Sequence, residues 1–76
     1  MITELFKNEN YEIIIKNNYL YIKNYINIFD ISMFKICVCI KSKKLYINGK
    51  DLIIFKMDKY DLGIKGIIKG IEIIDE

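Results

Sequence analysis

The sequence predicts an all-β fold, a small antiparallel β-sandwich of short strands, from three observations. Apolar residues recur in short pulses and alternate with glycine or charged residues, which is the period of a β-strand. Isoleucine, which is β-branched, is the most frequent residue, whereas alanine, the best helix former, is absent. Turn signals separate the pulses every seven to nine residues or so. A short β-roll or solenoid is the alternative architecture.

The expected strands are the apolar pulses at residues 13–15, 20–22, 26–31, 36–40, 45–47, 52–55, 64–68 and 71–74. The expected turns are the breaks at residues 16–18, 23–24, 32–33, 41–44, 48–51 and 57–63. Residues 2–8, and residues 57–62 with Asp58 as N-cap, are the two segments that could form a short helix.

Glycines supply the strongest conformational signals. Asn48 and Gly49 predict a type I′ hairpin turn, because that turn requires positive φ at both central residues and Asn-Gly tolerates it best. Gly66, together with Gly63 and Gly70, lies in a segment where lysine and isoleucine alternate as in a strand. We therefore expect these glycines to mark a bulge or a close approach of two backbones, not a phosphate-binding loop.

Length and charge restrict the class of protein. Seventy-six residues allow one domain, residues 1–76, with a small core. The net charge is +2 and the lysines are spread along the chain, so the basic stripe of a typical nucleic-acid binder is missing and we expect no nucleic-acid partner. The apolar runs fall short of the ~20 residues that cross a bilayer, so we expect a cytoplasmic protein without direct membrane insertion.

The sequence offers little chemistry. It has no histidine, no nucleophile motif and two cysteines, Cys37 and Cys39, on one expected strand. Their side chains would point to the same face with parallel Cβ vectors, which suits a disulfide poorly. We expect reduced thiols, no catalytic residues, no cofactor and no metal, because a structural zinc needs about four ligands.

Several strands carry apolar residues on both faces, so we expect part of the second face to be covered. The candidate interaction face consists of Cys37, Cys39, Tyr46, Ile53 and Phe55. A partner or a second copy of the chain would cover it, although a closed two-sheet sandwich could also absorb part of it. The alternative is a small β-barrel that binds single-stranded nucleic acid, with Tyr19, Tyr21, Tyr25 and Tyr46 as stacking platforms.

One family resemblance covers residues 13–73. The pattern Leu45-x-Ile47-x-Gly49-x-x-Leu52-x-Ile54 is followed by Ile64-x-Gly66-x-Ile68-x-x-Ile71-x-Ile73, and Ile22-Lys23-Asn24-Tyr25 stands upstream. In order and spacing these motifs resemble the YabP/YqfC family of sporulation proteins. Asn27 and Lys43 depart from the pattern, because the family typically has glycine at both positions.

The resemblance implies a β-rich protein without catalytic activity that is needed for endospore formation in low-GC Gram-positive bacteria. It also implies a protein–protein interaction module, acting in the mother-cell cytoplasm. Its partner would be a membrane-anchored sporulation protein similar to YqfD, or a second copy of the chain.

Overall fold

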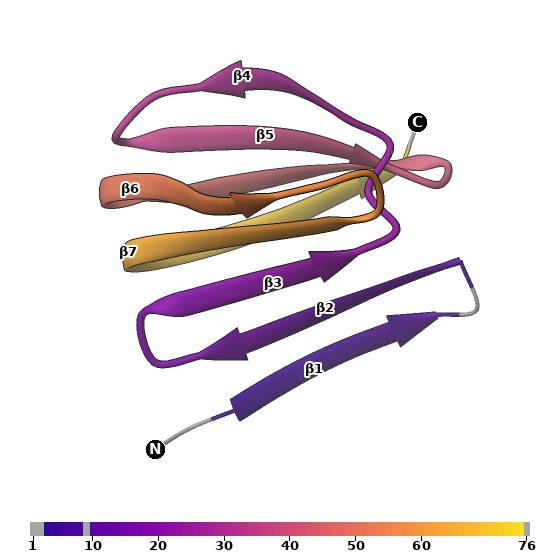
Figure 1. The fold of residues 1–76 in the computed structure, drawn as a ribbon, viewed down its shortest axis with the longest axis horizontal. Helices are drawn as coiled ribbons and strands as arrows, with labels where there is room; N and C mark the ends of the chain where they lie inside the picture. Colours follow the sequence, from indigo (N-terminus) through magenta and orange to yellow (C-terminus); the bar gives the residue numbers. More distant parts are fainter. Residues whose placement is uncertain (1–2, 9, 76) are drawn as a thin grey trace.

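Seven antiparallel strands form one sheet in the computed structural model, which describes residues 3–8 and 10–75 (Figure 1). The strands are β1 (Thr3–Asn8), β2 (Tyr11–Lys16), β3 (Tyr19–Lys23), β4 (Asn27–Ile31), β5 (Lys35–Ile40), β6 (Lys43–Met57) and β7 (Asp61–Asp75). Their order across the sheet is β1-β2-β3-β7-β6-β5-β4, so β1 and β4 are the edges and β7 is central. The prediction of an all-β, antiparallel fold is confirmed.

The hairpin of β6 and β7 bends the sheet strongly. Each of these strands has 15 residues and would be about 50 Å long if straight, whereas the longest dimension of the molecule is 27 Å. The pairing of β6 with β7 shifts register after Asn48, Lys50 and Ile54, and such irregularities bend and twist a strand.

The bend divides the sheet into two halves. The β3 half consists of β1, β2, β3, the start of β7 and the end of β6. The β5 half consists of β4, β5, the start of β6 and the end of β7. Figure 1 shows the long hairpin passing between the two sets of shorter strands.

A single core lies between the inner faces of the two halves. The β3 half contributes the fully buried side chains Ile13, Leu20, Ile22, Leu62 and Ile64, and the β5 half contributes Ile36, Val38, Ile40, Leu45 and Ile47. The two layers of the predicted sandwich are thus two halves of one bent sheet. Strands β6 and β7 are longer than the short strands expected from the pulses, because each continues through the bend.

The hairpin turn predicted at Asn48 and Gly49 is wrong. Both residues lie inside β6, and among the described residues only Gly66 is a glycine with positive φ. Gly49 is needed for space instead, since a Cβ there would lie 2.1 Å from the carbonyl oxygen of Ile67 on β7. Pairing with β7 therefore overrides the local turn preference, and the glycine lets two backbones meet at the bend.

The expectation for Gly66 is confirmed. Its φ is +137°, and a Cβ on it would lie 2.6 Å from the carbonyl oxygen of Asp51. Its N–H donates to the carbonyl oxygen of Asn18 at 3.0 Å. Gly66 is thus the point where β7, β6 and the β2–β3 turn come together. Of its two companions, Gly63 is approached by the side chains of Phe55 and Lys56 and not by a second backbone, whereas Gly70 has open space around it.

Turns lie at the predicted breaks 16–18, 23–24 and 41–44, although the connections themselves are residues 17–18, 24–26 and 41–42 and the remaining residues of the breaks belong to strands. Their left-handed residues are Asn17, Asn24 and Ser42, with φ of 47°, 64° and 61°. Neither Asn27 nor Lys43 has positive φ, so the residues that depart from the family's glycine pattern do not need left-handed backbone.

Neither of the two possible helices is present in the described residues. Residues 3–8 form strand β1, and Ile2 lies outside the described residues. The β6–β7 connection is too short for a helix. Asp58 accepts the N–H of Asp61 at 2.8 Å and that of Tyr60 at 3.2 Å, so its predicted capping role serves a tight turn.

Candidate functional site

The five residues predicted to form one interaction face lie on both sides of the bend. Cys37, Cys39 and Tyr46 belong to the β5 half, whereas Ile53 and Phe55 belong to the end of β6 in the β3 half. Cys37 is 1% exposed, so it cannot contact a partner, whereas Ile53 is 54% and Phe55 39% exposed. The prediction of one continuous face is therefore wrong, because strand alternation alone does not reveal the bend.

Aromatic and lysine side chains occupy the outer surface of the β5 half. Tyr46 lies across from Cys37 in the register, and the ring of Phe29 meets that of Tyr46 edge-on at 5.8 Å. The Nζ atom of Lys35 is 5.3 Å from the centre of the Tyr46 ring, and that of Lys44 is 5.5 Å from the Phe29 ring. The Tyr46 and Phe29 rings therefore each make a cation–π contact with a lysine of the same half.

Cys37 and Cys39 are free thiols. Burial raises the pKa of Cys37, with Lys35 opposing and Asp30 reinforcing that effect. A raised pKa favours the neutral thiol, which makes a poor nucleophile and metal ligand. Among the described residues, no three His, Cys, Asp or Glu side chains gather in a group that could hold a metal ion.

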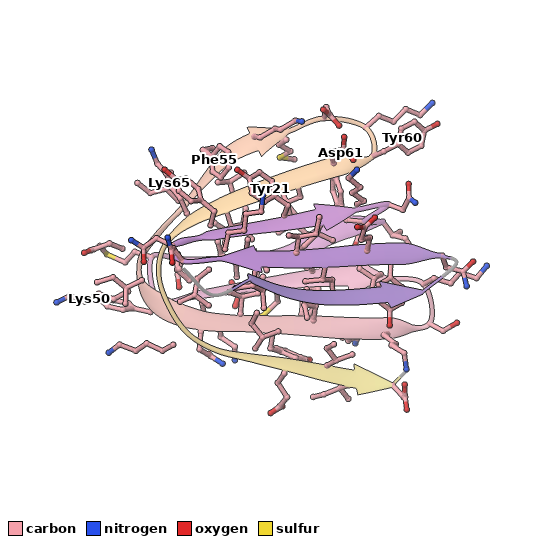
Figure 2. The ribbon with its side chains drawn as sticks, turned by 90° about the horizontal axis from the view of Figure 1, so that it is seen from below. Tyr21, Lys50, Phe55, Tyr60, Asp61 and Lys65 are labelled. Carbon is pink, nitrogen blue, oxygen red and sulfur yellow. The ribbon has the colours of Figure 1, made fainter. Side chains whose placement is uncertain are left out.

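Three aromatic rings meet on the outer surface of the β3 half. Tyr19 and Tyr21 flank buried Leu20 on β3, and their rings are 6.4 Å apart at an interplanar angle of 19°. The Phe55 ring, from β6, stands edge-on to both at 5.7 Å. It reaches them across β7 because Gly63 has no side chain there, and a Cβ would lie 2.8 Å from Cζ of Phe55. Figure 2 shows Phe55 and Tyr21 on this surface.

A row of alternating lysine and apolar residues crosses the same surface. The register aligns Lys16 with Tyr19, Tyr19 with Lys65, and Lys65 with Ile53. Both lysines are exposed. The ion pairs among the described side chains lie elsewhere, between Lys43 and Asp75 and between Lys56 and Asp61. The aromatic–lysine face, as we call it here, consists of Lys16, Tyr19, Tyr21, Ile53, Phe55 and Lys65.

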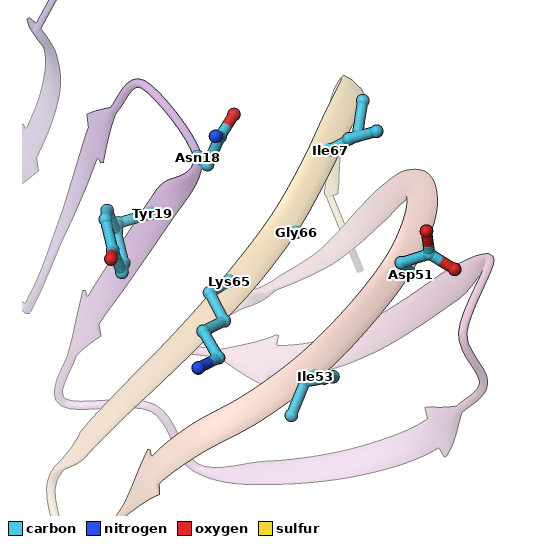
Figure 3. A pocket seen from close by; sticks show the side chains of 7 residues that line it. All are labelled: Asn18, Tyr19, Asp51, Ile53, Lys65, Gly66 and Ile67. Carbon is cyan, nitrogen blue, oxygen red and sulfur yellow. The ribbon is translucent and has the colours of Figure 1, made fainter.

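A shallow pocket of about 310 Å³ adjoins this face (Figure 3). Its lining comes from the β2–β3 turn, β3, β6 and β7, and consists of Asn18, Tyr19, Asp51, Ile53, Lys65, Gly66 and Ile67. Tyr19, Ile53 and Ile67 are 44%, 54% and 50% exposed, so the apolar part of the wall is open to solvent. The Lys65 ammonium lies between Tyr19 and Ile53 in Figure 3, and Asp51 lies at the β6 end.

The four tyrosines predicted as stacking platforms do not form one surface. Tyr19 and Tyr21 lie together, whereas the hydroxyl of Tyr25 donates to the backbone oxygen of Asp58 at 2.6 Å and Tyr46 packs against Phe29. Sequence reasoning missed the partnership of the β3 tyrosines with Phe55 and Lys65. The alternation in β3 indicated that Tyr19 and Tyr21 share a face, but only the pairing of β3 with β7 reveals what stands beside them.

Comparisons with protein-family models, with curated proteins and with solved structures returned no match for this chain. Within the described residues, the structure has no helix of the length and apolarity required to cross a membrane.

Proposed function

We propose that this chain is a non-enzymatic protein-interaction module that serves endospore formation, as its resemblance to the YabP/YqfC family implies. In this proposal it acts in the mother-cell cytoplasm and binds a membrane-anchored sporulation protein similar to YqfD, or a second copy of itself. The aromatic–lysine face is the binding surface.

One observation carries the proposal: the aromatic–lysine face lies on top of a core that is already filled. Leu20 and Ile64, directly beneath the face, are fully buried, whereas Tyr19, Ile53 and Phe55 remain between 39% and 54% exposed. Clustered exposed apolar side chains on a soluble domain are typical of interaction sites, and aromatic residues are the usual anchors. The face is thus free to contribute to binding, since folding uses the opposite side of the strands.

The test is a gene deletion with complementation in the host that encodes the chain, read out as heat-resistant spores. We expect deletion to lower the spore count sharply and the unaltered gene to restore it. Phe55→Lys should fail to restore it, whereas Phe29→Lys, the matched change on the β5 half, should succeed. Both variants are first compared with the unaltered protein by circular dichroism. A normal spore count after deletion would refute the proposal.

Single-stranded nucleic acid is a second candidate ligand, favoured by the stacked Tyr19 and Tyr21 rings beside Lys16 and Lys65. Aromatic stacking combined with lysines along the backbone is the common mode of sequence-tolerant binding. Binding of oligothymidylate that weakens steeply as salt rises would support this candidate.

A further inference from the structure

We propose that the aromatic–lysine face binds an extended acidic segment of the partner protein. The acidic side chains of that segment pair with Lys16 and Lys65, and an apolar side chain between them enters the pocket beside Tyr19. This inference rests on the proposed function and specifies the chemistry of the partner.

The apolar anchor follows from the pocket wall. Tyr19, Ile53 and Ile67 present apolar surface from three different strands around a hollow of about 310 Å³. Filling it with a leucine or phenylalanine side chain would remove apolar surface of both partners from water, which is the main favourable contribution to such association. Because the apolar residues Tyr19, Ile53 and Ile67 all lie on strands, the apolar part of the pocket exists before the partner arrives.

The acidic character follows from the charges around Tyr19. Lys16 and Lys65 stand on either side of it, one strand away in each direction, so their backbones are about 10 Å apart. Neither belongs to an ion pair or a cation–π contact among the described side chains, in contrast to Lys35, Lys44 and Lys56. Two carboxylates of an extended segment, separated by one apolar residue on the same side, are four residues and therefore about 13 Å apart. The long, flexible lysine side chains make up the difference from the spacing of their backbones.

Asp51 restricts where the acidic residues of the segment can lie. Its exposed carboxylate lies at the β6 end of the pocket, so a second acidic group would be repelled there. The acidic residues of the partner therefore lie over β2, β3 and β7, and the part of the segment that passes Asp51 is neutral or basic.

The ring geometry favours a peptide over single-stranded nucleic acid. Phe55 stands edge-on to both tyrosines, and Tyr21 is partly buried, so Tyr19 is the one ring of the three tightly packed aromatics with an open side next to the pocket. Sequence-tolerant binding of single strands uses several successive bases stacked on aromatic rings. One ring that is open beside the pocket, and two lysines without an ion pair among the described side chains, fit a short acidic peptide better.

The experiment uses the full chain labelled with ¹⁵N and a synthetic peptide, glutamate-serine-leucine-serine-glutamate, followed by two-dimensional NMR. We expect binding in the millimolar range or tighter, with amide shifts concentrated at residues 16–19, 53 and 64–67. The same peptide with lysine in place of both glutamates should shift these amides at least about fivefold less at equal concentration.

Variants separate charge from packing. Lys65→Glu should weaken binding of the acidic peptide about fivefold or more, because it replaces an attraction with a repulsion. Lys69→Glu makes the same charge change on β7 beyond the bend and should leave affinity within about twofold. Tyr19→Ala should weaken binding about tenfold.

Absence of shifts at millimolar acidic peptide, equal binding of the lysine peptide, or equal effects of Lys65→Glu and Lys69→Glu would overturn the inference. Oligothymidylate that shifts the same amides at lower concentration than the peptide would also overturn it, in favour of nucleic acid. The spore assay is independent of the peptide. Failed peptide binding together with lost complementation by Phe55→Lys would therefore reject the acidic segment and leave the proposed function standing.

Discussion

The two halves of the sheet use similar residues on their outer surfaces with different results. In each half one strand has an extra residue at a register shift, and that residue is a phenylalanine: Phe29 in β4 and Phe55 in β6. Each phenylalanine ring meets a tyrosine ring edge-on. In the β5 half, lysines of the same half lie over the rings. In the β3 half, Lys16 and Lys65 stand beside the rings and an open pocket adjoins them.

Exposure alone does not distinguish the outer surfaces of the two halves. Phe29 is 45% exposed and Phe55 39%, so the two rings are nearly equal by that measure. What distinguishes them is whether the neighbouring cations are already engaged. A lysine that already interacts with an aromatic ring has less to gain from a partner, whereas an unpaired lysine beside an apolar pocket contributes a new interaction.

The largest expected effect comes from breaking the bend that joins the halves. Gly49→Ala would place a Cβ 2.1 Å from the Ile67 carbonyl oxygen, a backbone atom that cannot move without shifting β7. We expect a loss of about 3 kcal/mol in the free energy of unfolding, measured by urea denaturation. Gly70→Ala is the control: nothing lies within 4 Å of its Cβ, so a change within about 0.5 kcal/mol is expected. Equal stability of both variants would show that the bend tolerates a side chain at residue 49.

The second effect concerns the covered surface of the β5 half. Cys37→Ser places a hydroxyl where the side chain is 1% exposed, and we expect a cost of about 2 kcal/mol unless it finds a hydrogen-bond partner. Cys39→Ser, at a partly exposed position of the same strand, should cost clearly less. Thermal denaturation of the two purified variants compares them directly. A Cys39→Ser variant that is the less stable of the two would reverse our assignment of which thiol is covered.

Phe55→Lys tests whether the open surface of the β3 half is separate from the core. We expect an unchanged circular dichroism spectrum and a loss of about 1 kcal/mol, because the variant loses two edge-on aromatic contacts but no core side chain. Any self-association, measured by sedimentation, should weaken. If the variant unfolds, Phe55 belongs to the core and the binding surface must be sought elsewhere.

The smallest effect lies at the β6–β7 turn, outside both surfaces. The N–H groups of Asp61 and Tyr60 lower the pKa of Asp58 below its usual value. A lowered pKa in the folded state means that the ionised carboxylate stabilises the fold above the unfolded-state pKa of about 4, and that this stabilisation is lost as the pH falls through the folded-state pKa. Asp58→Ala should therefore lower the midpoint of thermal unfolding slightly at pH 7 and by less at pH 2. Asp58→Asn keeps one acceptor oxygen, so its unfolding midpoint at pH 7 should lie between those of the unaltered protein and Asp58→Ala. A difference that does not depend on pH would contradict this role of the charge.

Strand alternation accounts for the core of the short strands better than for the outer surface. Leu20 and Ile22 follow the period of two in β3, whereas in β6 the buried positions change from Leu45 and Ile47 to Leu52 at the bend. The bend was not predictable locally, since Asn48 and Gly49 favour a hairpin turn in isolation and only pairing with β7 makes them part of a strand. The aromatic–lysine face depends on the same long-range pairing, because Tyr19, Lys65 and Ile53 become neighbours only when β3, β7 and β6 lie side by side.

The central position of β7 also governs the order in which the molecule can be assembled during synthesis. Strand β3 must wait for residues 61–65, about forty positions later, before it gains its second neighbour, and β6 waits for the same strand. On the ribosome the two partial sheets β1–β3 and β4–β6 therefore emerge with open edges, facing the risk of incorrect pairing that unpaired strands carry. Pairing across such long sequence separations is slow, on the millisecond-to-second scale. A chaperone that shields β3 until β7 has emerged would therefore raise the yield of folded protein more than a chaperone that acts on the finished chain.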